Sequence, residues 1–167
     1  GVVENLLSIT RLNDGRLKIK FTDQLLDEVI TESLRHISRK HEDYQIDVEC
    51  EEFILVYMDV RLIIQVLVNL IDNAIKYGDD GKYLGITVEE KEKEVYVLFE
   101  DHGQGIENIE IEKIFNRSYT LSDTNKNYES SGLGLAISKN LANGMNSDIL
   151  VKSIPHKQTV FNWKIKK

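Results

Sequence analysis

Residues 65–77 read Gln-Val-Leu-Val-Asn-Leu-Ile-Asp-Asn-Ala-Ile-Lys-Tyr, and this stretch organises the rest of the chain. Apolar residues recur here in pairs with helical spacing, which is typical of a helix with one buried face. They occupy positions 62, 63, 66, 67, 70, 71, 74 and 75. Asp59 stands just before the pattern, where a carboxylate would cap the helix. The sequence therefore predicts a long amphipathic helix that begins after Asp59.

A polar row runs along another edge of the same helix. It consists of Gln65, Asn69, Asn73 and Lys76. Spacings of four, four and three residues place these side chains in line. Asparagine oxygens can coordinate a hard cation, and a lysine ammonium can meet phosphate. The row predicts either a site for an oxygen-rich ligand or a solvated polar edge, and the helix alone does not separate the two.

The composition bounds the class of protein. The chain has 167 residues, of which 41% are hydrophobic and 29% charged, as expected for one globular domain with its own core. Its net charge of −7 argues against a nucleic-acid-binding protein, which needs a basic surface. The one cysteine, Cys50, is expected to be a small buried residue in a strand rather than a nucleophile. No apolar run approaches a membrane span, and no stretch resembles a signal peptide.

Apolar runs and alternation predict the remaining elements. Strands are expected at residues 16–21, 45–50, 53–58, 84–89, 95–101, 148–154 and 159–165. Helices are expected at residues 22–39, capped by Thr22 or Asp23, at 111–115 and at 133–145, while residues 1–13 read as the end of another helix. Strands and helices mix without strict βαβ alternation. The predicted fold class is therefore α+β, a two-layer sandwich with helices on one face of a mixed sheet.

Two glycine clusters flank a long polar segment, residues 116–131. The first, residues 101–106 (Asp-His-Gly-Gln-Gly-Ile), follows a strand, where glycines permit close approach to a flat ligand and a carboxylate can accept from an amino group. The second, residues 130–135 (Ser-Ser-Gly-Leu-Gly-Leu), opens a helix, whose free N–H groups suit phosphate. Taken alone, the first is better explained as a strand-ending turn, and the second is only suggestive. A segment as long as 116–131 inside a compact domain is usually functional or disordered.

In this order and spacing, the helix and the two clusters resemble the N box, G1 box and G2 box of the GHKL ATP-binding fold, in its sensor histidine kinase branch. Residues 69–77 resemble the N box, and Ile114-Phe115 resembles the start of the F box. The resemblance runs from the helix end at residues 6–12 to the last strand. Residues 16–19 and Tyr119-Thr120 further resemble the KdpD type of potassium-responsive sensor kinase. The family implies ATP and Mg²⁺ as cofactors and a long ATP lid.

The resemblance implies a role for each matching residue. Asn73 would ligate Mg²⁺, Asn69 would support the metal or the phosphates, and Lys76 would reach the phosphates. Asn69 and Lys76 are thus the expected catalytic residues. Tyr77 would pack near the nucleotide, and Asp101 would accept the adenine amino group. The rest of the nucleotide site would be Gly103, Gly105 and Ile106 around the base, Gly132, Leu133, Gly134 and Leu135 around the phosphates, and Thr159 in water-mediated contacts to adenine.

Several positions depart from the family's pattern. Ser118 stands where the F box usually repeats phenylalanine. Thr120 stands where many members carry an arginine toward the γ-phosphate, and Arg117 is an alternative donor for that contact. Ser130 replaces the first glycine of the second cluster, and Asn146-Ser147 replaces a common Gly-Gly turn. None of these changes removes a residue assigned to the nucleotide, so we expect nucleotide binding to be kept, in a weaker form.

The residue one turn before the metal asparagine separates kinases from hydrolases in this family. In gyrase, Hsp90 and the mismatch-repair ATPases a glutamate stands there and activates water, whereas this chain has Asn69. An amide cannot act as a general base near neutral pH. We therefore expect transfer of the γ-phosphoryl group to a histidine. The alternatives are a degenerate binding module without phosphotransfer, and an ATP hydrolase.

The acceptor histidine is not recognisable in this chain. Its histidines are His36, His41, His102 and His156. His41-Glu42 begins like the family's acceptor motif, but residues 43–45 do not continue it. We expect residues 1–14 to end an upstream dimerisation and phosphoacceptor hairpin, and residues 15–167 to form the catalytic domain. The implied partners are that acceptor helix and a response regulator, with no nucleic acid, and the parent protein is expected at a membrane with this domain on the cytoplasmic side.

Overall fold

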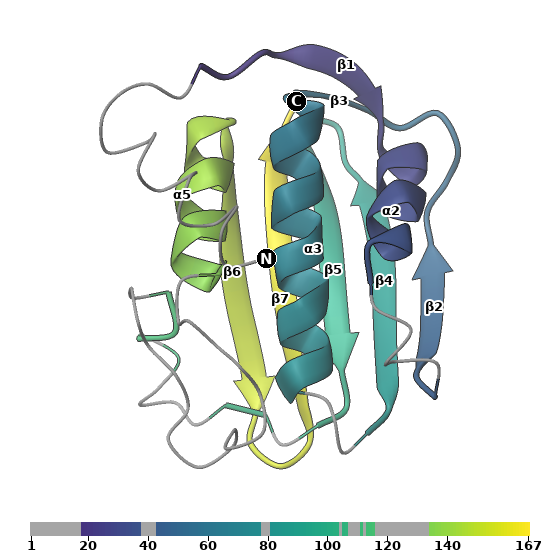
Figure 1. Ribbon diagram of the computed structural model, residues 1–167, viewed down its shortest axis with the longest axis vertical. Helices are drawn as coiled ribbons and strands as arrows, with labels where there is room; N and C mark the ends of the chain where they lie inside the picture. Colours follow the sequence, from purple (N-terminus) through teal and green to yellow (C-terminus); the bar gives the residue numbers. More distant parts are fainter. Residues whose placement is uncertain are drawn as a thin grey trace.

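The computed structural model describes residues 18–37, 43–77, 81–103, 105–106, 111, 113–115 and 134–167. In this part of the chain, helices α2, α3 and α5 pack on one face of a five-stranded sheet, and a two-stranded sheet lies at one end (Figure 1). The helices span Leu26–Arg35 (α2), Val60–Tyr77 (α3) and Gly134–Gly144 (α5). The strands span Thr22–Leu25 (β1), Gln45–Glu49 (β2), Leu55–Met58 (β3), Tyr83–Glu90 (β4), Glu94–Asp101 (β5), Ser147–Ile154 (β6) and Gln158–Lys166 (β7). The predicted α+β sandwich is confirmed.

The larger sheet is mixed and has the strand order β2-β4-β5-β7-β6. Strands β2 and β4 run parallel, and every other neighbouring pair runs antiparallel. The predicted hairpin of β4 and β5 is confirmed. Because β5 and β7 are neighbours, Asp101 at the end of β5 lies opposite Thr159 of β7.

Helix α3 buries the face that its apolar spacing predicts. The eight apolar residues of that face are at most 4% exposed: Leu62, Ile63, Val66, Leu67, Leu70, Ile71, Ala74 and Ile75. Asp59 caps the helix as predicted, since its Oδ1 accepts the N–H of Arg61 at 3.0 Å. The Arg61 guanidinium also closes on the same carboxylate at 2.7 Å. These two contacts fix the first turn of α3, and the first turn in turn fixes the side of the helix on which the polar row lies.

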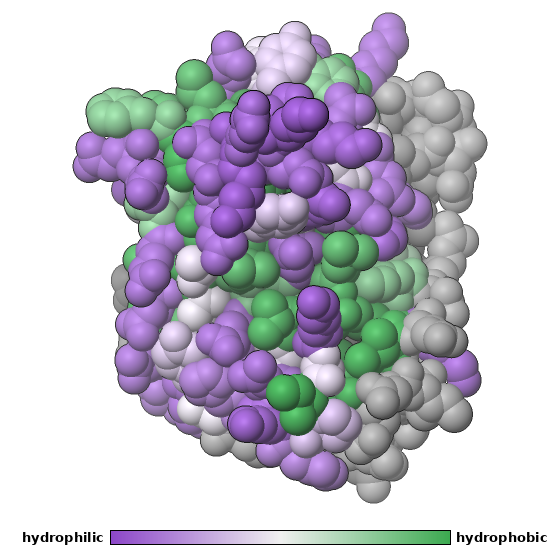
Figure 2. Space-filling view, turned by 180° about the vertical axis from the view of Figure 1, so that it is seen from behind, coloured by the Kyte–Doolittle hydropathy of each residue, from purple (hydrophilic) through white to green (hydrophobic). Residues whose placement is uncertain are grey.

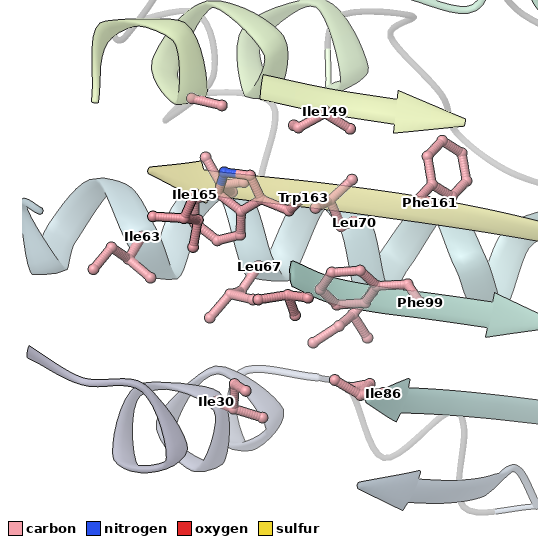
Figure 3. Close-up of a cluster of buried hydrophobic side chains, with 14 of the residues drawn as sticks. Ile30, Ile63, Leu67, Leu70, Ile86, Phe99, Ile149, Phe161, Trp163 and Ile165 are labelled. Carbon is pink, nitrogen blue, oxygen red and sulfur yellow. The ribbon is translucent and has the colours of Figure 1, made fainter. Parts of the chain in front are cut away.

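The core lies between the helices and the larger sheet. Figure 3 shows Leu67 and Leu70 of α3 in one cluster with Phe99, Phe161 and Trp163 of the sheet, and all five side chains are fully buried. The Trp163 indole N–H donates to Ser147 Oγ at 2.9 Å, so the polar atom of the largest core side chain is satisfied. This packing fixes α3 rigidly over β5 and β7.

The start of the domain differs from the prediction. Residues 18–21 form no strand; β1 begins at Thr22 and pairs antiparallel with β3, with Thr22 opposite Met58. Thr22 and Asp23 therefore lie in a strand and cap no helix. Helix α2 begins only at Leu26 and ends at Arg35, short of residue 39, and Leu25 caps it without a side-chain hydrogen bond. Strand pairing overrides the local capping signal here, because the backbone N–H and C=O groups of residues 22–25 bond across to β3.

Among the residues that the structure describes, no helix or strand covers the face of the larger sheet opposite the helices. Figure 2 shows this face as largely hydrophilic with a band of hydrophobic residues across it. Leu150 and Ile154 of the edge strand β6 are exposed. Within the described residues, no helix combines the length and the apolar character that crossing a membrane requires.

Cys50 is half-buried just after β2, where the sequence predicts a buried strand residue. Its Sγ contacts the carbonyl oxygen of Glu51 at 3.4 Å. Burial, reinforced by the charges of Asp27 and Glu51, raises the pKa of the Cys50 thiol to about 11. The thiol therefore stays protonated at neutral pH, which agrees with the expectation that it is not a nucleophile.

Candidate functional site

Asn69 joins the polar edge of α3 to the start of α5. Its Nδ2 donates to Ser138 Oγ at 3.1 Å and to the carbonyl oxygen of Gly134 at 3.4 Å. The Ser138 hydroxyl in turn donates to the Gly134 carbonyl at 2.7 Å. Asn69 and Ser138 are both buried. The structure thus brings the predicted polar row against the helix that the second glycine cluster opens.

Asn73 lies one turn further along α3 and is half-buried. Its Nδ2 donates to the backbone carbonyl of Asn69 at 2.7 Å. Its Oδ1 accepts no hydrogen bond from any residue that the structure describes. The side chain is therefore not turned into the core. Its nitrogen is hydrogen-bonded, while its oxygen, the kind of atom that a hard cation prefers, meets no donor among the described residues.

Asp101 ends β5 and is completely buried. Its Oδ1 accepts the N–H of Gly103 at 3.1 Å. Its Oδ2 is equally buried and has no hydrogen-bond partner among the described residues. A buried carboxylate oxygen without a donor is rare and costly, so this atom indicates a ligand that brings an N–H or O–H group.

Burial raises the pKa of the Asp101 carboxyl to about 6, against the opposing effect of the Gly103 N–H. The ordinary value is 3.8, so the folded domain holds the proton more tightly than the unfolded chain does. The ionised carboxylate therefore lowers stability as pH rises from about 4 to about 6, and the full cost is present above pH 6. At neutral pH the group is ionised and acts as an acceptor.

A hydroxyl network joins the last two strands to the first glycine cluster. Ser153 Oγ donates to the carbonyl of Gln158 at 2.9 Å and accepts the N–H of Ile106 at 2.6 Å. It also lies 3.0 Å from Thr159 Oγ1. Because the Ser153 proton is already committed, the Thr159 hydroxyl donates in this pair and keeps its lone pairs for another donor. Thr159 is buried beside Asp101, so two acceptors flank this end of the sheet.

Gly105 shows why the first cluster needs glycine. Its φ is +72°, a conformation that side chains with a Cβ rarely adopt. A Cβ at this position would also overlap the carbonyl oxygen of Ile154 and come within 2.9 Å of Pro155 Cα. The cluster can therefore lie directly on the turn between β6 and β7, with Ile106 buried.

Some predicted site residues lie outside what the structure describes. Gly132 and Leu133 are not among the described residues, and for Lys76 and Tyr77 only the helical backbone is described. Gly134 and Leu135 form the first turn of α5, with Leu135 buried. Their roles, like those of Lys76 and Tyr77, stay predictions.

Sequence reasoning missed Ser138 and Ser153, each of which contacts a predicted site residue. Serine in a helix or strand carries no signal of its own, because its usual partner is a nearby backbone carbonyl. A weak signal existed for Ser138: it lies four residues after Gly134, on the same face of the helix. For Ser153 the register of β6 against β7, which places it opposite Thr159, was needed.

We expect Ser153→Ala to destabilise the domain by about 1–2 kcal/mol, because it leaves the Ile106 N–H without its acceptor. Urea unfolding of the nucleotide-free domain measures this loss. Lys152→Ala, at an exposed neighbouring position on β6, is the control and should change stability by less than about 0.5 kcal/mol. Equal stability of the two variants would show that the Ser153 network contributes nothing.

Comparison with known proteins places this arrangement in a family. The sequence model of the family described as "Histidine kinase-, DNA gyrase B-, and HSP90-like ATPase" matches residues 58–167, which include α3, both described parts of the glycine clusters and β7. The chain belongs to this ATPase family. ATP is accordingly the nucleotide that the domain binds.

Relatives of this ATPase domain are sensor kinases. The chain is 36% identical to the sensor protein KdpD of Clostridium acetobutylicum over 99% of its own length, and 38% identical to the sensor histidine kinase YcbM of Bacillus subtilis over 62%. It spans 19% and 33% of those two proteins. Among solved structures, the catalytic domain of the histidine kinase ThkA superimposes with a TM-score of 0.74 at 28% identity, covering 89% of this chain and 98% of that one. The mycobacterial sensor histidine kinase MprB shares the fold, with a TM-score of 0.77 at 22% identity, covering 88% of this chain and 97% of that one.

Proposed function

We propose that this chain is the catalytic domain of a sensor histidine kinase, which binds Mg-ATP and passes the γ-phosphoryl group to a histidine on an upstream helix. One observation carries the choice of kinase over hydrolase: Asn69 occupies the place of the water-activating base, and its amide is tied to Ser138 and Gly134. An amide in that place cannot take a proton from water. Bound ATP would then be hydrolysed slowly, and its γ-phosphoryl group would remain available to an incoming nucleophile.

The described residues fit the nucleotide. Asp101 Oδ2 is a buried acceptor that meets no donor among the described residues, which matches it to the adenine amino group, and Thr159 adds lone pairs beside it. The Asn73 oxygen, supported by Asn69, would hold Mg²⁺, which when bound neutralises phosphate charge. Lys76 would meet the phosphates, and the start of α5 would supply backbone N–H groups to them. The domain's own contribution to catalysis is positioning and charge complementarity.

The parent protein would be longer than this chain, which spans 19% of KdpD and 33% of YcbM. Residues 1–14 would end the dimerisation and phosphoacceptor hairpin, and residues 15–167 would be the catalytic domain. The 36% identity to KdpD over nearly the whole chain supports a KdpD-type, potassium-responsive parent. Its partners would be the acceptor helix, of its own chain or of a dimer mate, and a response regulator. The parent would be anchored in a membrane, with this domain in the cytoplasm.

The test of the kinase function is phosphotransfer to the parent's acceptor hairpin. We expect the domain, mixed with that hairpin and labelled Mg-ATP, to produce an acid-labile phosphohistidine on the hairpin. A hairpin whose acceptor histidine is replaced by glutamine is the control. Nucleotide binding without any labelling of the intact hairpin would instead identify a degenerate binding module.

Phosphate release separates the kinase from a hydrolase. The isolated domain should release phosphate from ATP only very slowly, because Asn69 supplies no general base. A coupled phosphate assay over several hours measures this rate. Steady turnover that disappears in Asn69→Ala would contradict the proposal and identify an ATP hydrolase.

Nucleotide affinity should depend on the protonation of Asp101. Below about pH 6 the carboxyl gains a proton, so affinity for an ATP analogue should fall by up to tenfold per pH unit. Titrations between pH 5 and pH 8 measure this slope. The phosphates of the ligand titrate in the same range, so the ratio to Asp101→Asn at each pH isolates the Asp101 contribution. A ratio independent of pH would contradict the assignment.

A further inference from the structure

We infer that Ser153 is a positioning residue that sets the choice of base: it holds the Thr159 hydroxyl proton toward β6, so that the base end of the site offers acceptors only. Such an end takes a purine with an amino group, as in adenine, and rejects one with a carbonyl at the same place, as in hypoxanthine. The inference rests on the proposed function, because it assigns what selects the base in that site. It concerns a residue for which the sequence pattern predicts no role.

The direction of each proton follows from the three groups around Ser153 Oγ. The carbonyl of Gln158 can only accept, and at 2.9 Å it takes the serine proton. The N–H of Ile106 can only donate, and it reaches Ser153 Oγ at 2.6 Å. Thr159 Oγ1 lies 3.0 Å from the same oxygen, so the proton between the two hydroxyls must come from the threonine. Ser153 therefore fixes the direction in which Thr159 donates.

The strand register carries this direction to the base end of the site. Thr159 of β7 lies opposite Ser153 of β6 on one side and opposite Asp101 of β5 on the other. Thr159 and Asp101 are completely buried, and Asp101 Oδ2 meets no donor among the described residues. With its proton on Ser153, Thr159 adds only lone pairs to that carboxylate oxygen.

Acceptors alone in a buried place discriminate strongly between bases. An amino group supplies the donor that the site is missing. A carbonyl in its place faces other acceptors and gains no hydrogen bond in exchange for its water, which is the costly case for a buried polar group. We therefore expect the unmodified domain to bind an adenosine triphosphate analogue at least about a hundredfold more tightly than the matching inosine analogue, in which a carbonyl replaces the amino group.

A second serine of β6 separates this role from the general effect of a buried hydroxyl. Ser147 is also buried; its hydroxyl donates to the carbonyl of Ala142 at 2.6 Å and accepts the indole N–H of Trp163 at 2.9 Å. Like Ser153, it thus joins a backbone carbonyl to a side-chain donor. It lies at the other end of β6, opposite Ile165, away from Asp101. Ser147 is therefore a matched control.

The test compares Ser153→Thr with Ser153→Val, which have the same shape and differ only by the hydroxyl. The measured quantity is the ratio of the dissociation constants of the two non-hydrolysable analogues, inosine over adenosine, both with Mg²⁺. Threonine should keep the ratio of the unmodified domain within about twofold. Valine should lower it by about tenfold, because the Thr159 hydroxyl can then turn and donate to the carbonyl of the inosine base. Equal ratios for the two variants would overturn the inference.

A double-mutant cycle shows whether Ser153 acts through Thr159. In a Thr159→Val domain there is no hydroxyl to orient, so adding Ser153→Val should change the ratio less than twofold. A tenfold fall in that background as well would overturn the inference.

Ser147→Ala and Ser153→Ala complete the design. Both should lower the urea midpoint, because each removes a buried hydroxyl that serves two partners, but only Ser153→Ala should lower the base ratio. A merely structural role for Ser153 would weaken both analogues equally and leave the ratio as it is. Equal affinity of the unmodified domain for the two analogues would overturn the inference while leaving ATP binding intact.

A nucleotide-free readout keeps the inference separate from the proposed function. The ¹³Cβ shift of Thr159, assigned by its loss in Thr159→Val, and the amide shift of Ile106 should stay in Ser153→Thr and move in Ser153→Val. If the unmodified domain binds neither analogue, the proposed function fails while these spectra still test the positioning. Identical shifts in the threonine and valine variants would overturn the positioning itself.

Discussion

Replacing Asp101 with asparagine is expected to weaken ATP binding strongly and, at the same time, to stabilise the nucleotide-free domain. The carboxylate supplies two acceptors: Oδ1 takes the Gly103 N–H, and Oδ2 is left for the ligand. Asparagine has one acceptor oxygen. Either Gly103 or the adenine amino group would then face an NH₂ group, so we expect affinity to fall by at least about a hundredfold.

The gain in stability follows from the pKa of Asp101. Its rise from 3.8 to about 6 corresponds to roughly 3 kcal/mol of unfavourable burial of charge at neutral pH. Asparagine removes that charge but buries an NH₂ group without an acceptor, so we expect a net gain of about 1–2 kcal/mol at pH 7 to 8. The gain should shrink as pH falls toward 4, where the carboxyl of the unmodified domain is protonated.

Urea unfolding across this pH range, together with calorimetric titration, measures both effects. Asp23→Asn makes the same chemical change at an exposed position of β1 and should alter neither quantity. An Asp101→Asn domain that binds the analogue normally, or whose stability relative to the unmodified domain does not change with pH, would contradict the role given to Asp101.

Replacing Asn73 with alanine is expected to abolish magnesium-dependent nucleotide binding. The variant removes the half-buried oxygen assigned to the metal and one hydrogen bond to the Asn69 carbonyl. Alanine is also the better helix former, so the two local effects nearly cancel and the domain should keep its stability within about 1 kcal/mol. Affinity in the presence of Mg²⁺ should fall at least about a hundredfold, down to the value measured without the metal.

The control for Asn73 is Asn140→Ala, an exposed asparagine in α5. It makes the same chemical change in a helix away from the metal row, so both dissociation constants should stay as they are. Unchanged calorimetric affinity of Asn73→Ala in Mg²⁺ would show that the metal is held elsewhere.

The fold and the main lines of the site could be predicted because their signals are local and periodic. The buried face of α3 follows from its apolar spacing, and the same spacing puts Asn69 and Asn73 on one edge. Asp101 and the glycines after it can be recognised from their order in the sequence, because glycines that directly follow a buried strand mark the point where the backbone turns. These signals were enough to predict the α+β class; they also name the candidate site residues, whose roles stay predictions.

The remaining features depend on contacts between distant segments. Residues 22–25 read as a helix start and form β1 because β3 pairs with them across more than thirty residues. Ser153 gains its role only from the register of β6 on β7, and Ser138 only from the packing of α5 on α3. The direction of an amide is likewise set by its partners, so the sequence could name Asn69 but not which of its atoms faces α5.

The central claim is that Asn73 and Asp101 serve one magnesium-bound adenine nucleotide. Isothermal titration of the unmodified domain with a non-hydrolysable ATP analogue, with Mg²⁺ and then with EDTA, tests it most directly. We expect one site per chain and an affinity at least about a hundredfold tighter with the metal than without it. Absence of binding heat under both conditions, or equal affinity with and without Mg²⁺, would contradict it.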